Sequence, residues 1–329
     1  MNTEERNKRN NSFLLSIVVP MYNEEKVCDI FFQRILPLLE SITANFEIIC
    51  VDDGSNDKTL DILKSKNTLE PRIKIIGLTR NFGKEFALTA GIDYARGDAI
   101  IPIDADLQDP PELILELVSK WREGFDMVEA VRSSRQSDSM AKRLSAHAFY
   151  GVMGRIGNIP IRSNSGDFRL MDRTVVNALK TLPERTRFMK GLFSWLGFRK
   201  ATIYYSRTLR AAGESKWNYW KLWNFALEGI FSFTTLPLRI WTYLGLFVAS
   251  FSIIYSIFII IRTAIYGIDV PGYASLIVII LFFNGLVMIG LGIVGEYLGR
   301  VFIEVKQRPL YLVRDSIGFG AVNPNNHQE

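Results

Sequence analysis

The stretch "AIIPIDADLQDPPE", residues 99–112, decides which fold this chain is expected to adopt. It opens with a short apolar run that is typical of a strand buried on both faces. Asp104, Asp106 and Asp109 follow that run at once. Clustered carboxylates beside a buried strand are costly unless a ligand or a cation requires them there. The stretch therefore predicts a strand that ends at a polar site.

Apolar runs and helical patterns alternate on both sides of this stretch. Strands are predicted at residues 15–19, 46–51, 73–78, 99–103 and 126–131. Helices are predicted at residues 24–39, 58–64, 84–94 and 111–121. This alternation indicates an α/β fold with a mostly parallel sheet that is covered by helices on both faces. Ligands bind such sheets beyond the carboxyl ends of the strands.

Acidic groups follow three of the predicted strands. "PMYNEE" (20–25) follows the first, "DDGS" (52–55) the second, and "DADLQD" (104–109) the fourth. A turn or a helix cap explains any one of them equally well, but three that converge at one edge indicate a ligand site. No G-x-G-x-x-G follows the first strand, and "GLTRNFGKE" (77–85) lacks the spacing of a phosphate loop. A nicotinamide cofactor is therefore not indicated.

The fourth group predicts a divalent cation. Asp104 and Asp106 stand two apart in an extended segment, so their side chains share a face and repel each other unless a cation lies beside them. Gln108 continues the same parity and offers a further oxygen. Hard cations such as Mg²⁺ take carboxylates together with substrate phosphates, and would neutralise a diphosphate leaving group. With 2 histidines in the chain, a histidine-based metal site is excluded, and the 2 cysteines do not have the spacing of metal ligands.

The last third of the chain predicts two membrane spans. Residues 240–261 and 270–295 carry no charged side chain, and each is long enough to cross a bilayer as a helix. Basic residues flank the two spans, whereas the connecting loop "YGIDVPGYAS" (266–275) has none. This asymmetry predicts a multi-pass protein whose head and both termini are cytoplasmic. A net charge of +5 on such a protein suggests anionic lipid or phosphate, and not nucleic acid, as its partner.

An aromatic segment precedes the first span. Trp217, Trp220 and Trp223 recur every three residues, which predicts amphipathic helices in the membrane interface, or else a helix packed on the head. The expected domains are a cytoplasmic catalytic head (1–215), interfacial helices (216–239), two transmembrane helices (240–300) and a cytoplasmic C-terminal tail (301–329).

Five motifs, in order and spacing, resemble the GT-A-fold glycosyltransferases of family 2. They are "VVPMYNEE" (18–25), "VDDGS" (51–55), "LTRNFGKE" (78–85), "DADLQDPPE" (104–112) and "SGDFRLMDR" (165–173). More narrowly, the chain is similar to the polyprenyl-phosphate glycosyltransferases, which include dolichol-phosphate mannose synthases and GtrB-type bactoprenol glucosyltransferases. The resemblance covers nearly the whole chain. It implies a GT-A head, Mg²⁺ or Mn²⁺, a nucleotide sugar, a polyprenyl phosphate acceptor, the bacterial inner membrane, and a homo-oligomer such as a tetramer.

The resemblance also implies roles for individual residues. It implies that a nucleotide-sugar pocket is formed by Pro20, Tyr22, Glu24, Asp52, Asp53, Lys84 and Asp104. It also implies that Asp104, Asp106 and Gln108 bind the cation, and that Asp106 and Asp167 are catalytic. Contacts to the lipid phosphate or the diphosphate are implied for Arg132, Arg135, Arg169, Arg210, Ser215 and Lys216. Asp167 is either a general base or a positioning group, because a phosphate monoester is already largely dianionic at neutral pH.

The implied reaction is the inverting transfer of one sugar to polyprenyl phosphate. Glucose from UDP-glucose is favoured, with UDP-aminoarabinose and GDP-mannose as the alternative donors. A processive polysaccharide synthase shares the fold, but its Q-x-x-R-W motif and multi-span pore are missing. A transporter or flippase is disfavoured because Arg262 and Asn284 are the notable polar residues in or near the spans. A non-catalytic anchor would leave the acidic groups unexplained.

Overall fold

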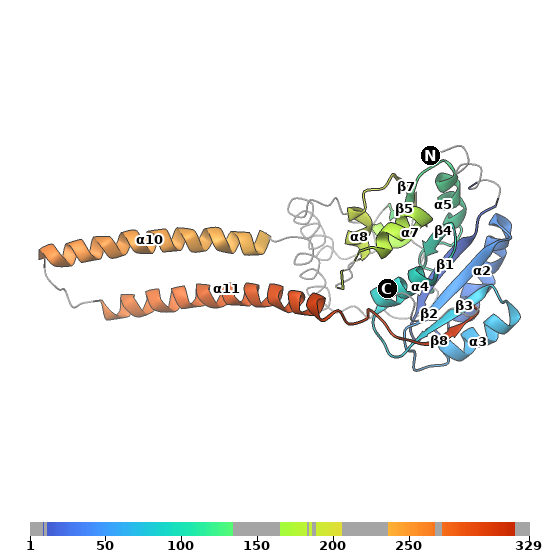
Figure 1. Cartoon of the computed structure of the whole chain (residues 1–329), viewed down its shortest axis with the longest axis horizontal. Helices are drawn as coiled ribbons and strands as arrows, with labels where there is room; N and C mark the ends of the chain where they lie inside the picture. Colours follow the sequence, from blue (N-terminus) through green and yellow to red (C-terminus); the bar gives the residue numbers. More distant parts are fainter. Residues whose placement is uncertain are drawn as a thin grey trace. The chain divides into compact units, whose positions relative to one another are not determined.

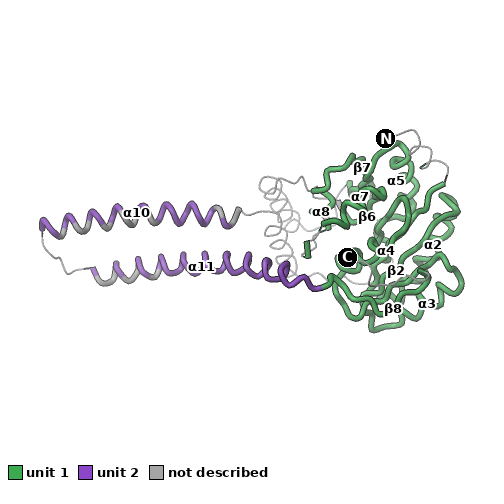
Figure 2. Tube along the Cα trace, in the orientation of Figure 1, with its two compact units in different colours: residues 1–222, 309–329 green, residues 223–308 purple. Residues whose placement is uncertain are grey.

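The computed structural model describes Arg9 and residues 12–133, 165–182, 184–185, 189–205, 236–266 and 272–319. The chain divides into two compact units, coloured green and purple in Figure 2. The first unit, called the head below, comprises residues 1–222 together with residues 309–329. The second unit comprises residues 223–308.

The head is built on an eight-stranded sheet with the strand order β7-β5-β6-β4-β1-β2-β3-β8 (Figure 1). The strands are β1 (Leu15–Met21), β2 (Phe46–Asp52), β3 (Ile73–Leu78), β4 (Ala99–Pro102), β5 (Met127–Arg132), β6 (Ser165–Asp172), β7 (Lys200–Tyr205) and β8 (Val313–Ile317). Strands β3, β2, β1 and β4 run parallel to one another, as do β5 and β7. β6 is antiparallel to β4 and β5, and β8 is antiparallel to β3. The predicted mostly parallel sheet is confirmed.

Helices cover both faces of this sheet. They are α2 (Cys28–Ile42), α3 (Thr59–Leu69), α4 (Lys84–Tyr94), α5 (Leu113–Arg122), α7 (Arg173–Lys180) and α8 (Met189–Trp195). Buried residues of α2 and α5 share one hydrophobic core with Ile17 on β1. Because side chains alternate along a strand, Val18 points to the other face, where α4 packs. A Cβ at Gly91 of α4 would clash with Val18, so glycine permits this close approach.

The predicted elements are present with shifted ends. Each of the five predicted strands overlaps a strand of the sheet, and α4 has the predicted bounds of 84–94. α2 begins at Cys28 instead of Glu24, because residues 25–27 form a turn. The thiols of Cys28 and Cys50 are free and buried.

Three strands lie where no strand was expected, namely β6, β7 and β8. β8 falls within the predicted C-terminal tail, yet it pairs with β3 and extends the sheet. Tyr311 Oη donates to Asp93 Oδ2 at 2.9 Å, and the ring of Phe319 meets that of Tyr94 edge-on at 5.1 Å. The head therefore includes chain on both sides of the apolar segment.

The second unit contains two long helices, α10 (Leu236–Tyr266) and α11 (Tyr273–Lys306). Within the described residues, one stretch is long and apolar enough to cross a membrane, Phe282–Lys306 of α11, with a mean hydropathy of 1.7. Two membrane spans thus remain a prediction. The aromatic residues Trp217, Trp220 and Trp223, predicted to lie in the interface, fall outside the described residues.

Candidate nucleotide-sugar site

The acidic groups converge at the carboxyl edge of the sheet. The backbone N–H of Asn23, after β1, donates to Ser55 Oγ at 3.0 Å, and Asn23 Oδ1 accepts the N–H of Asn56 at 2.9 Å. The loops that follow β1 and β2 are therefore in direct contact. Pro20, Tyr22 and Glu24, which are implied to line the pocket, are half-buried at this edge.

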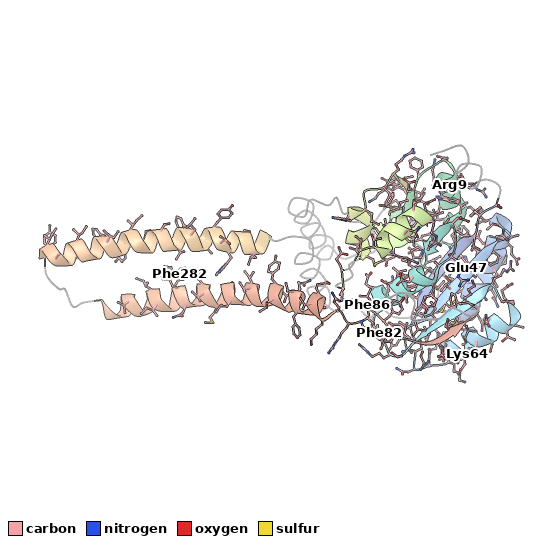
Figure 3. All side chains as sticks on the ribbon, viewed as in Figure 1. Arg9, Glu47, Lys64, Phe82, Phe86 and Phe282 are labelled. Atoms are coloured by element: carbon pink, nitrogen blue, oxygen red, sulfur yellow. The ribbon has the colours of Figure 1, made fainter. Side chains whose placement is uncertain are left out.

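Asp53 is buried and holds the loop that leads into α4. Its two carboxylate oxygens accept the backbone N–H groups of Phe82 at 2.7 Å and Gly83 at 2.9 Å. In Figure 3, Phe82 and Arg9 are labelled on different sides of the head. Burial raises the pKa of Asp53, although these two hydrogen bonds oppose the shift. Asp53 thus organises protein backbone, in addition to the nucleoside contact implied for it.

Asp52 is the last residue of β2 and is fully buried. Its oxygens accept the N–H of Ser55 at 3.3 and 3.4 Å. Burial raises the pKa of Asp52, while Ser55 and the charge of Arg314 on β8 counteract part of that shift. A carboxylate that is costly to ionise at a ligand-binding edge is typical of a functional site.

Lys84 joins residues from three elements. It is the first residue of α4, and its Nζ lies 2.7 Å from Asp104 Oδ1, beyond β4, and 2.9 Å from Asp167 Oδ2, on β6. Desolvation opposes the shift, but the charges of Asp104 and Asp167 raise the pKa of Lys84 well above its ordinary value. The structure therefore brings an ammonium group between two carboxylates for which the sequence implied different roles.

The oxygen donors expected to hold a cation lie together in one loop. Asp106 Oδ1 accepts the backbone N–H of Gln108 at 3.2 Å, and Leu107 between them has a left-handed φ of 55°. Over the described parts of the chain, no group of three or more His, Cys, Asp and Glu side chains could hold a metal by itself. Two carboxylates and one amide oxygen nevertheless fit Mg²⁺ or Mn²⁺, because these ions complete their coordination with water and substrate phosphates. The donor set of Asp104, Asp106 and Gln108 is thus chemically suited to the ion.

Asp109, from the same loop, contacts β5 and β7. Arg132 Nη2 lies 3.4 Å from Asp109 Oδ1, and its Nε donates to Tyr205 Oη at 3.2 Å. The hydroxyl of Tyr205 donates to the same Asp109 oxygen. Burial and the Asp109 charge raise the pKa of Tyr205, so the hydroxyl stays protonated. Arg132 was expected to bind phosphate. Asp109 belongs to the acidic stretch but had no individual role predicted, and nothing in the sequence predicted Tyr205.

Arg169 is buried inside the head. Its Nη2 donates to the carbonyl of Gly166 at 2.6 Å, and its guanidinium carbon lies 4.1 Å from the ring centroid of Phe193. Burial lowers its pKa. Asp167 and Arg169 stand two apart in β6, and the charge of Asp167 favours the charged form of the Arg169 guanidinium. Arg135, Arg210, Ser215 and Lys216, also expected to contact phosphate, lie outside the described residues.

The chain is similar to known glycosyltransferases over most of its length. Residues 16–180 match the family described as Glycosyl transferase family 2. An uncharacterized glycosyltransferase of Synechocystis sp. is 60% identical over 304 residues, covering 92% of this chain and 96% of that relative. An SfII prophage-derived bactoprenol glucosyl transferase of Shigella flexneri is 50% identical over 302 residues, covering 92% of this chain and 98% of the relative.

Solved structures give a more distant likeness. The glucosyl-3-phosphoglycerate synthase of Mycobacterium tuberculosis, solved with Mn²⁺, uridine diphosphate and phosphoglyceric acid, is 20% identical, with a TM-score of 0.48. The match covers 70% of this chain and 80% of that structure.

Proposed function

This chain belongs to glycosyl transferase family 2, and we propose that it transfers one glucosyl residue from UDP-glucose to undecaprenyl or another polyprenyl phosphate. One observation carries the proposal: the 50% identity to the bactoprenol glucosyl transferase of Shigella flexneri spans 92% of this chain and 98% of that relative. A match of that extent includes the apolar segment as well as the head. The transfer inverts the anomeric carbon and yields a polyprenyl-phosphate sugar.

The donor binds at the carboxyl edge of the sheet. Asp52 and Asp53 hold the nucleoside, with Pro20, Tyr22 and Glu24 beside it, and Asp104, Asp106 and Gln108 hold Mg²⁺ or Mn²⁺. Bound there, the cation would neutralise charge on the departing diphosphate. The contacts of Asp106 and Gln108 within one tight loop support this assignment, because they hold both donors in one short segment.

The acceptor is a phosphate monoester, whose own oxygen is the nucleophile. With a second pKa of about 6, it is largely dianionic at neutral pH and needs little help from a base. Asp167 stands beside Lys84 and orients groups near the acceptor, or takes the residual proton. Arg132 and Arg169, together with Arg135, Arg210, Ser215 and Lys216, supply cationic and polar contacts to phosphate.

The head works at the cytoplasmic face of the bacterial inner membrane. Helices α10 and α11 anchor it, and the interfacial helices expected at residues 216–239 allow a lipid phosphate to reach the site without leaving the bilayer. Anchoring raises the effective concentration of the lipid acceptor. The proposal also includes a homo-oligomer in which copies of the chain associate through these helices.

The test is a donor panel with membranes containing the full chain. Radiolabelled UDP-glucose, UDP-aminoarabinose and GDP-mannose are each supplied with polyprenyl phosphate and Mg²⁺ or Mn²⁺, and the lipid fraction is counted. Label from UDP-glucose should enter the lipid, and Asp106→Asn should abolish it. Label from another donor alone would replace glucose with that sugar, and no labelled lipid from any donor would refute the proposal.

A further inference from the structure

Lys84 occupies a carboxylate that a cation also needs. Its Nζ lies 2.7 Å from Asp104 Oδ1 and 2.9 Å from Asp104 Oδ2, so both oxygens of this side chain face the ammonium. A Mg²⁺ ion bound to Asp104 requires one of those oxygens at about 2.1 Å. The positive charge of the ammonium repels a second cation at the same carboxylate. Lys84 and a divalent cation therefore compete for Asp104.

The burial of the three side chains shows which contact can open. The side chain of Lys84 is 46% exposed and that of Asp104 is 37% exposed, whereas Asp167 is 15% exposed. The backbone before Lys84 is held by Asp53 through the N–H of Gly83. The ammonium can thus swing away from Asp104 on its flexible stem while the helix start stays in place.

Local charge indicates what moves it. Asp104, Asp106 and Asp167 together with the Lys84 ammonium sum to two negative charges, so a divalent cation at this site shares Asp104 with the ammonium unless the ammonium finds another anion. A nucleotide diphosphate supplies that anion. The cation and the diphosphate are therefore expected to arrive together, with the ammonium turning from Asp104 toward phosphate.

We propose that Lys84 is a positioning residue that closes the cation site to a divalent ion alone and opens it when the nucleotide diphosphate binds. This inference rests on the proposed role of Asp104 as a cation ligand. It makes donor and cation binding cooperative, and it keeps Asp104 and Asp167 paired with one positive charge between turnovers.

The experiment titrates Mn²⁺ into the full chain in lipid nanodiscs without nucleotide, and follows free Mn²⁺ by its paramagnetic resonance signal. Lys84→Met removes the competing charge, so Mn²⁺ should bind about tenfold tighter than to the unaltered chain. Lys84→Arg keeps the charge and should bind Mn²⁺ as the unaltered chain does. With UDP present, the difference between Lys84→Met and the unaltered chain should shrink.

A double variant makes the test specific. In an Asp104→Asn background, Lys84→Met should no longer tighten Mn²⁺ binding, because the contested oxygen pair is gone. Thermal unfolding checks that each variant is folded, and Lys84→Gln replaces Lys84→Met if the latter fails that check. Unchanged or weaker Mn²⁺ binding in the folded neutral variant, or a gain that persists without Asp104, would overturn the inference.

The Mn²⁺ titration and the donor panel can fail separately. A tighter Mn²⁺ site in Lys84→Met, together with no labelled lipid from any donor in the panel, would support the competition and refute the glucosyl transfer. Labelled lipid from UDP-glucose together with unaltered Mn²⁺ binding in Lys84→Met would support the glucosyl transfer and refute the competition for Asp104.

Discussion

Asp53 and Gly83 tie the end of β2 to the start of α4, because Asp53 Oδ2 accepts the backbone N–H of Gly83 at 2.9 Å. Gly83 precedes Lys84, whose ammonium reaches Asp104 and Asp167. The buried carboxylate of Asp53 thus fixes the backbone position from which the Lys84 side chain reaches Asp104 and Asp167. The binding edge is organised by hydrogen bonds to backbone as much as by the side chains that face a ligand.

Asp53→Ala should destabilise the head. The change removes the acceptor of two backbone N–H groups, those of Phe82 and Gly83, in a buried setting. We expect the free energy of unfolding to fall by roughly 1–3 kcal/mol, measured by thermal or denaturant unfolding. Asp53→Asn keeps one oxygen acceptor and should lose less. Equal stability of all three proteins would mean that this carboxylate serves a ligand alone.

Asp52→Asn should become relatively more stable as pH rises. Because burial raises the pKa of Asp52 above its ordinary value of 3.8, ionising it costs the folded state free energy. That cost is absent below the ordinary pKa and complete above the raised one, and asparagine never ionises. Melting temperatures compared between about pH 4 and about pH 7 should therefore shift in favour of the variant, while UDP affinity falls. A pH-independent difference in melting temperature would contradict the raised pKa.

Asp109→Ala should destabilise the head more than it affects the cation. It leaves Arg132 and Tyr205 without their shared acceptor, which should cost about 3 kcal/mol of unfolding free energy. Tyr205→Phe, which removes one hydroxyl, should cost about 1 kcal/mol. Mn²⁺ affinity in the presence of UDP should hold in Asp109→Asn and fall in Asp106→Asn. Loss of Mn²⁺ affinity in both would place Asp109 among the cation ligands.

Ending the chain after Arg308 should destabilise the head although the apolar helices stay intact. The truncation removes β8 and leaves β3 as an unpaired edge, together with the loss of the Tyr311–Asp93 hydrogen bond and the Phe319–Tyr94 ring contact. We expect a lower melting temperature and aggregation on size-exclusion chromatography. Ending the chain after Phe319 is the matched control and should behave as the full chain does. Identical behaviour of both truncations would mean that β8 is dispensable.

Local patterns sufficed for the centre of the sheet. β1, β2, β3 and β4 are short buried runs separated by helices, and a parallel sheet of this kind brings its carboxyl ends to one edge. The acidic loops after β1 and β2 could therefore be placed together before any contact was known. β6 and β8 escaped prediction because charged residues interrupt their apolar pattern, as in "SGDFRLMD" and "VRDSI".

The sequence alone was enough to predict an α/β head with acidic groups at the carboxyl edge, followed by long apolar segments. The periods of strands and helices and the lengths of apolar runs are local properties, so they can be read from neighbouring residues. The partners of each charged group were decided by the tertiary structure. Lys84 meets Asp167, Tyr205 meets Asp109, and β8 meets β3 across long intervals of chain. Such contacts depend on how the whole sheet and its helices pack. They cannot be predicted from the residues that neighbour a side chain in the sequence.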